Sequence, residues 1–85
     1  MKGESLMLAK VYVTLKNGVL DPQGKAVQHS LESIGFKEAQ DVRIGKFIEL
    51  RLSDMPRNEA EKKVKEMCEK LLANTVVENY RFEIE

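Results

Sequence analysis

The fold depends on the stretch Asp41–Leu52, which reads Asp-Val-Arg-Ile-Gly-Lys-Phe-Ile-Glu-Leu-Arg-Leu. Apolar residues alternate with polar ones on both sides of Gly45, and this period of two predicts extended β structure. In a hairpin, Gly45 and Lys46 would form a type II′ turn, which would place Arg43 opposite Ile48 on one face. A single strand that bends or bulges near Gly45 separates the apolar side from the charged side more cleanly, and we favour it.

A strand and a helix are expected before this stretch. Residues 10–16 alternate β-branched or apolar side chains with polar ones, which predicts a strand that ends at Asn17-Gly18. Asp21 suits a helix N-cap, and Pro22 suits the first helical position because its missing N–H costs nothing there. The helix is expected to run to about Ile34. Its apolar stripe consists of Val27, Leu31 and Ile34.

A second helix and a last strand are expected after it. Residues 58–72 carry an apolar stripe at spacings of four, three and four, made of Ala60, Val64, Met67 and Leu71, with Cys68 on the same side. Asn58 with Glu61 resembles a capping box, although Asp54 competes as the helix start. Residues 76–84 again show the period of two that predicts a strand.

The order β-α-β-α-β predicts an α+β fold, a small sheet with two helices packed on one face and a long, bent central strand at residues 41–52. That strand is about twice the usual length, so we expect it to overhang its neighbours and to pair with another chain. Residues 1–85 are expected to form a single domain, in which residues 1–7 are a loosely ordered leader.

Composition excludes several classes of function. The 85 residues hold 14 Lys or Arg and 14 Asp or Glu, so the net charge is zero, which argues against nucleic acid or an anionic membrane as the main partner. The single cysteine excludes an internal disulfide framework. No apolar run is long enough for a transmembrane helix or a signal peptide, so the expected compartment is the cytoplasm.

The residues show little chemistry of their own. His29, the only histidine, is expected on the polar face of the first helix, and Cys68 is expected in the core rather than as a reactive thiol. Pro22–Lys25 opens a helix, where anions can bind, but Asp21 already occupies the capping position. There is no phosphate-binding glycine motif and no set of metal ligands. The residues alone therefore predict a small α+β subunit without a complete active site.

Three segments at their observed spacing resemble one family. Residues 10–16 followed by 19–27, the segment 41–50, and the helix end 68–74 before a closing strand are together similar to PurS, the small subunit of phosphoribosylformylglycinamidine synthase. The resemblance covers nearly the whole chain from about Leu8.

The resemblance implies a subunit without an active site. The synthase uses ATP, Mg and glutamine to convert formylglycinamide ribonucleotide to formylglycinamidine ribonucleotide in purine biosynthesis. A glutaminase subunit releases ammonia, a large synthetase subunit binds ATP and the ribonucleotide, and PurS bridges the two. The resemblance also implies that PurS binds no cofactor itself and that it forms a homodimer or a tetramer.

The family motifs supply candidate partner-contact residues, which are Asp21, Pro22, Gln23, Gly24 and Lys25 in the first motif and Asp41, Arg43, Gly45 and Lys46 in the second. Some have an alternative structural role, since Asp21 and Pro22 start a helix and Gly45 allows a bend. The side chains of Gln23, Lys25, Arg43 and Lys46 have no evident internal role, and we expect them to contact partners.

Two other functions remain open at this point. Small domains of this type also bind a nucleotide or an amino acid between paired sheets, which would make the chain a ligand-sensing module. A third hypothesis is a small independent enzyme that uses His29.

Overall fold

The computed structural model describes residues 6–85. The elements follow in the order β1 (Leu6–Leu15), α1 (Pro22–Ser33), β2 (Gly45–Ser53), α2 (Arg57–Met67), a wide helical turn η1 (Cys68–Leu72) and β3 (Glu78–Ile84). The predicted β-α-β-α-β order and the α+β class are confirmed. Of the predicted leader, residues 1–5 lie outside the described residues, whereas Leu6 and Met7 pair with Ser53 and Leu52 and so belong to β1.

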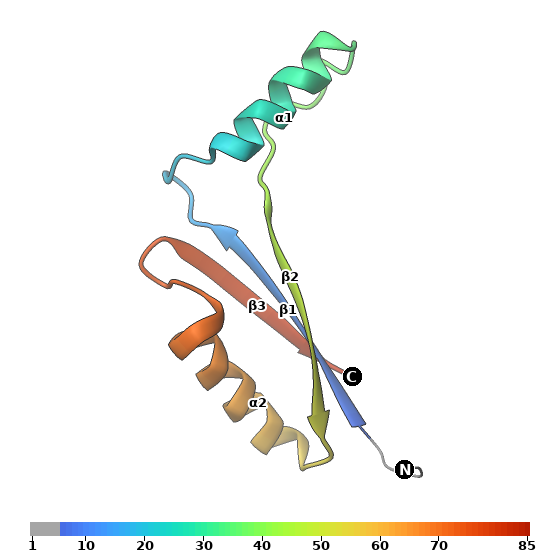
Figure 1. Ribbon diagram of the computed structural model, residues 1–85, viewed down its shortest axis with the longest axis vertical. Coiled ribbons are helices and arrows are strands. Elements are labelled where there is room, and N and C mark those ends of the chain that lie inside the picture. The colour runs from blue at the N-terminus through green and yellow to red at the C-terminus, as the bar shows by residue number, and fades with distance from the viewer. Residues whose placement is uncertain (1–5) are drawn as a thin grey trace.

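The sheet has the strand order β2-β1-β3, and both outer strands run antiparallel to β1 (Figure 1). The expected long central strand is therefore wrong in two respects. β2 is an edge strand of 9 residues that begins at Gly45, and all of it pairs with β1, from Leu6↔Ser53 to Thr14↔Gly45. β2 thus has no overhang. The chain before Gly45 is extended but unpaired, because β1 ends at Leu15 and turns away into α1.

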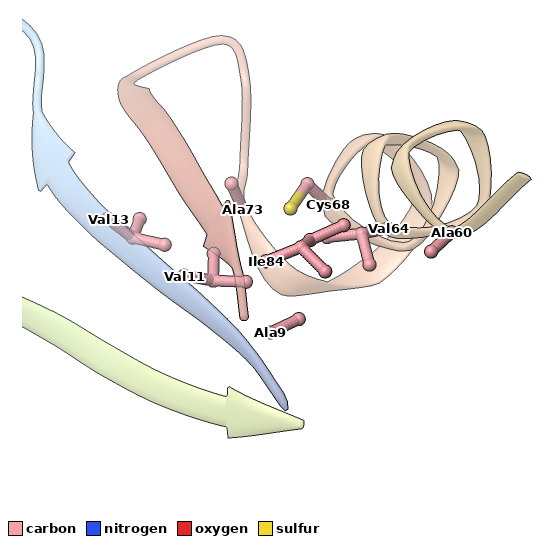
Figure 2. Close-up of a cluster of buried hydrophobic side chains, with 8 residues drawn as sticks. All are labelled: Ala9, Val11, Val13, Ala60, Val64, Cys68, Ala73 and Ile84. Carbon is pink, nitrogen blue, oxygen red and sulfur yellow. The ribbon is translucent and has the colours of Figure 1, made fainter. Parts of the chain in front are cut away.

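A hydrophobic core lies between the sheet and α2. Figure 2 shows the side chains of Val11 and Val13 from β1 turned toward Val64 and Cys68 of the helix, and each of these four is at most 1% exposed. Ala9, Ala60, Ala73 and Ile84 complete the buried cluster. Period two in the strands and period 3.6 in the helix bring these apolar faces together.

The wide turn η1 changes which residues of the second helical segment are buried. The amide of Ala73 donates to the carbonyl of Cys68 at 3.0 Å, a spacing of five residues rather than four. The extra residue rotates Leu71, expected in the buried stripe, out to 82% exposure, while Leu72 packs against the core. The expected capping box is also wrong, because Pro56 occupies the N-cap of α2 and no side chain caps it.

The first helix does not lie on the sheet. α1 projects beyond the end of the strands, together with the extended segment that returns from it to β2 (Figure 1). We call residues 20–44 the arm. The expectation that two helices pack on one face is therefore wrong for a single protomer, in which only α2 covers the sheet. The physical reason is that the start of α1 is bound to the returning segment rather than to the sheet.

Candidate partner-binding site

Asp21 joins the two predicted motifs where the arm meets the sheet, although the first candidate residues of the motifs, Asp21 and Asp41, are 20 positions apart in sequence. One carboxylate oxygen accepts the N–H of Gly24 at 2.8 Å and caps α1, and the other accepts the N–H of Ile44 at 2.9 Å. The side chain is buried, with 5% exposure of the residue. The hydrogen bond from the N–H of Ile44 and, as the next largest cause, that from the N–H of Gly24 hold the pKa of Asp21 below its ordinary value. Asp21 therefore fixes the start of α1 to the beginning of β2.

Arg43 holds the same region from the other motif. Its guanidinium donates to the carbonyls of Leu15 at 3.0 Å and Lys16 at 2.9 Å, and more weakly to that of Val19 at 3.4 Å. These carbonyls belong to the end of β1 and the turn that leads into the arm. The premise that Arg43 has no internal role is therefore wrong, because the side chain binds this turn.

Two glycines allow the close approach of backbone segments. A Cβ on Gly24 would collide with the carbonyl oxygen of Val42, and a Cβ on Gly45 would collide with that of Val13. Backbone cannot move aside as a flexible side chain can. Both candidate glycines thus have a steric role in the junction, the region formed by residues 15–25 and 41–46.

The remaining candidates are exposed around this junction. Pro22, Gln23, Lys25, Asp41 and Lys46 all lie at the surface. Lys46 makes only weak contacts, one with the carbonyl of Leu72 at 3.4 Å and one with the carboxylate of Glu78 at 3.9 Å. Within residues 6–85, no hydrogen bond or ion pair of the Gln23 or Lys25 side chain is found. These side chains are available to another molecule.

Two clefts flank the junction. One, of about 370 Å³, is lined by Val13, Thr14, Leu15, Asp21, Pro22, Gln23, Ile44, Gly45, Lys46 and Glu78. The other, of about 300 Å³, is lined by Gly18, Val19, Leu20, Asp21, Lys25, Asp41, Val42 and Arg43. All nine candidate residues therefore line at least one of the clefts or lie beside one.

The sequence raised two side chains as potentially reactive, and the structure describes both. His29 is exposed on α1, and burial raises the pKa of the Cys68 thiol, which makes a thiolate nucleophile unfavourable. Across residues 6–85, no three or more His, Cys, Asp or Glu side chains are grouped so that they would hold a metal ion. In that same range, none of the helices has the length and apolar character needed to cross a bilayer.

Sequence reasoning missed an aromatic cluster on the sheet face opposite α2. The rings of Tyr12 and Phe47 lie on paired strands with centroids 5.1 Å apart. The Arg81 guanidinium sits 3.9 Å from the centre of the Tyr12 ring. Phe47 is 54% exposed. The sequence did contain a signal for this cluster, because both aromatic residues alternate along their strands with residues that face the core. Exposed aromatic residues are common in the centres of protein interfaces.

Comparison with known proteins places this chain in a family. The model of the family described as "PurS: Phosphoribosylformylglycinamidine (FGAM) synthase" matches residues 8–85. The chain belongs to the PurS family. It is 62% identical over 76 residues to the phosphoribosylformylglycinamidine synthase subunit PurS of Bacillus subtilis, covering 89% of each chain.

Solved PurS structures share the fold. A crystal structure of Bacillus subtilis PurS has a TM-score of 0.82 at 59% identity and covers 93% of this chain and 98% of the other. A chain in the structure of PurLQS from Thermotoga maritima has a TM-score of 0.86 at 30% identity, covering 95% and 99%. These similarities support the PurS interpretation, and they give no support to the alternative of a ligand-sensing module.

Proposed function

We propose that this chain is the assembly subunit of a phosphoribosylformylglycinamidine synthase, an ATP- and glutamine-dependent ligase, and that it holds the synthetase and glutaminase subunits together. The observation that carries the proposal is the PurS match over residues 8–85, together with a relative that is 62% identical.

The contribution of such a subunit to catalysis is positional. Ammonia released at one site and used at another is lost when water captures and protonates it on the way. A subunit that holds the two sites in fixed, sheltered positions lowers that loss without reacting itself. The proposal requires a rigid molecule with polar surface groups for its partners.

The junction has both properties. Asp21 binds the two segments of the arm to each other, and Arg43 binds the arm to the end of β1, in each case through hydrogen bonds to backbone. Gly24 and Gly45 bring the segments close together. We therefore propose that Asp21, Arg43, Gly24 and Gly45 shape the surface of the junction. The exposed candidates Pro22, Gln23, Lys25, Asp41 and Lys46 are proposed to contact the synthetase, the glutaminase or both.

Reconstitution with the two partner subunits tests the assembly role. With all three present, the complex is expected to form product from glutamine. Without this chain, glutamine-dependent synthesis should be lost, whereas synthesis from added ammonium should persist because the synthetase site is intact. Equal glutamine-dependent rates with and without the chain would contradict the proposal.

A paired substitution tests the exposed candidates. The double variant Gln23→Ala/Lys25→Ala is expected to weaken binding to the partner subunits without changing thermal stability, because neither side chain makes an internal hydrogen bond within residues 6–85. Lys62→Ala/Lys65→Ala on the exposed side of α2 is the matched control. If both double variants bind the partners as tightly as the wild type, the junction is not the contact surface.

A further inference from the structure

Within one chain, the arm is joined to the sheet by few contacts. α1 projects beyond the ends of the strands, so packing on the sheet of its own chain does not fix its direction (Figure 1). The backbone crosses between the arm and the rest of the chain twice, at residues 19–20 and 44–45. Between residues 6 and 85, every hydrogen bond from the arm to the rest of the chain is donated by the guanidinium of Arg43. The angle between arm and sheet therefore depends on this one side chain.

The carbonyls that Arg43 binds are themselves fixed to the sheet. Leu15 is the last residue of β1, and the N–H of Lys16 donates to the carbonyl of Val77 at 2.9 Å, next to the start of β3. The guanidinium donates to the carbonyls of Leu15 at 3.0 Å and of Lys16 at 2.9 Å. Its planar fork of donors holds several acceptors in a fixed direction. We call these hydrogen bonds, with the weaker one to Val19, the Arg43 latch.

The arm is held together by its own contacts, so a change of angle would move it as one body. At its base, the carboxylate of Asp21 binds the amides of Gly24 and Ile44. Further out, the side-chain amide of Gln28 on α1 donates to the carbonyl of Gln40 in the returning segment at 2.7 Å. These bonds join the outgoing and returning halves of the arm at two levels. A displacement at the latch is therefore transmitted along the whole arm.

The proposed partner surface is divided between the arm and the sheet. Gln23 and Lys25 are exposed on the arm, whereas Lys46 is exposed on β2. The cleft of about 370 Å³ has walls from both parts, since Gln23 lies on one side of the latch and Thr14 and Lys46 lie on the other. The width of this cleft and the spacing of these side chains thus change with the angle that the latch sets.

We propose that Arg43 is a positioning residue for ammonia transfer in the synthase, because it sets the angle between the two surfaces that hold the partner subunits. Arg43 touches no reacting group and acts through the surfaces that it positions. With the latch removed, the glutaminase and synthetase sites lose their fixed spacing, and water captures more of the ammonia in transit. The inference rests on the proposed function and assigns one residue to it.

The angle can be measured on the full chain without the partner subunits. Spin labels on Glu32→Cys in the arm and Ser53→Cys at the end of β2 report the distance between arm and sheet, and the native Cys68 is buried and so protected from labelling. Dilution with unlabelled chain restricts the measured distances to those within one chain. Pulsed electron paramagnetic resonance should give a narrow distribution for this labelled chain and a broad one after Arg43→Ala. Equal widths would overturn the proposal.

Reconstitution with the synthetase and glutaminase subunits separates positioning from mere loss of stability or affinity. The chain is titrated into the two subunits, and the ratio of glutamine-dependent to ammonium-dependent synthesis is followed to its plateau. A variant that only folds or binds less well needs more chain to reach the wild-type plateau. Arg43→Ala is expected to reach a plateau about tenfold lower, since misplacement by about 1 Å can cost up to about a hundredfold in rate. The glutamate released per product formed should rise.

A matched control and a milder variant complete the experiment. Arg51→Ala removes an exposed arginine of β2 for which no hydrogen bond or ion pair is found within residues 6–85, and it should reach the wild-type plateau. Arg43→Lys keeps the charge and the aliphatic stem, so it remains informative if Arg43→Ala does not fold, and its plateau should lie between the two. If the chain is required but both Arg43 variants reach the wild-type plateau, the role of Arg43 is wrong. If glutamine-dependent synthesis needs no form of the chain, the proposed function itself is wrong.

Discussion

Gly24→Ala is the most informative single substitution, because two effects act at this position in opposite directions. Gly24 lies in the first turn of α1, where replacement by alanine would by intrinsic propensity stabilise the helix by about 1 kcal/mol. The added Cβ, however, would overlap the carbonyl oxygen of Val42 and lie 3.0 Å from the carboxylate carbon of Asp21.

The steric effect should prevail. Overpacking typically costs about 1–3 kcal/mol, and the upper end applies here because the opposing atom belongs to backbone. Taking about 3 kcal/mol for the collision and about 1 kcal/mol for the propensity gain leaves a net loss of about 2 kcal/mol. This corresponds to a roughly thirtyfold increase in the opening of the junction.

Hydrogen exchange measures that opening directly. The amides of α1 and of Ile44 are expected to exchange roughly thirtyfold faster in Gly24→Ala, while the amides of α2 and β3 keep the wild-type rates. Ser30→Ala, at an exposed position of the same helix, controls for the propensity effect and should slow exchange slightly. If the α1 amides exchange as slowly in Gly24→Ala as in Ser30→Ala, the contact between α1 and the segment before β2 is not tight, and the assigned role of Gly24 in the junction is wrong.

Four further outcomes are expected. Val64→Ala should lower the free energy of unfolding by about 2 kcal/mol and the melting temperature by about 10 °C, since it removes two fully buried methyl groups. Thermal denaturation measures this change, and a shift below about 2 °C would contradict the assignment of Val64 to the core. Arg43→Lys should loosen the turn at residues 15–19, seen as faster amide exchange there, because an ammonium group lacks the planar fork of donors with which the guanidinium reaches three carbonyls. The pKa of Asp21 is lowered in the folded protein, so its contribution to folding stability is complete above its ordinary pKa near 4 and is lost as the pH falls through the lower folded value. Asp21→Asn should remove this acid dependence, measured as the hydrogen-exchange protection of α1 against pH. A pH profile of protection that is the same as that of the wild type would argue against this role of Asp21. A hydrogen bond of 2.6 Å to Glu69 raises the pKa of Tyr80 to about 12. The contribution of this hydrogen bond to folding stability is therefore complete below the ordinary pKa of tyrosine near 10 and is lost toward pH 12. In denaturant titrations, the difference in unfolding free energy between wild type and Tyr80→Phe should shrink over that range, and a constant difference would exclude the contact.

The chain order and most element types follow from local signals. Asp21 followed by Pro22 predicted the start of α1, and the structure has this cap. Gly35 follows the helix with a φ of 106°, as a glycine after a helix end commonly does. The strand parities also placed Val11, Val13 and Ile84 on the core side. These features depend on neighbours within a few residues, so a single sequence contains them.

The errors arose where the outcome depends on something outside the segment concerned. The wide turn η1 adds one residue to a helical turn, and neither Leu71 nor Leu72 indicates which of the two will be buried. Asp41–Ile44 has the alternation of a strand, but a strand requires a partner, and β1 ends at Leu15. The pattern was right about the extended backbone and wrong about its pairing.

The candidate site illustrates a second limit. The motif residues could be chosen from sequence, but their roles could not, because Arg43 reaches a turn that lies 24 to 28 residues away in the chain. A charged side chain without a local partner looks available for another protein. Here it is a structural residue of the junction, and the surface candidates are its exposed neighbours.

The arm shows the most general limit. The apolar spacing of Val27, Leu31 and Ile34 says that one face of α1 is covered, but hydrophobic burial is non-directional and does not specify which chain supplies the cover. The prediction of two helices on one face fails for one protomer, since Ile34 is 69% exposed there. A period in a sequence therefore predicts how many faces must be buried, and the number of chains that bury them has to be decided by geometry, here by an arm that projects away from the sheet of its own protomer.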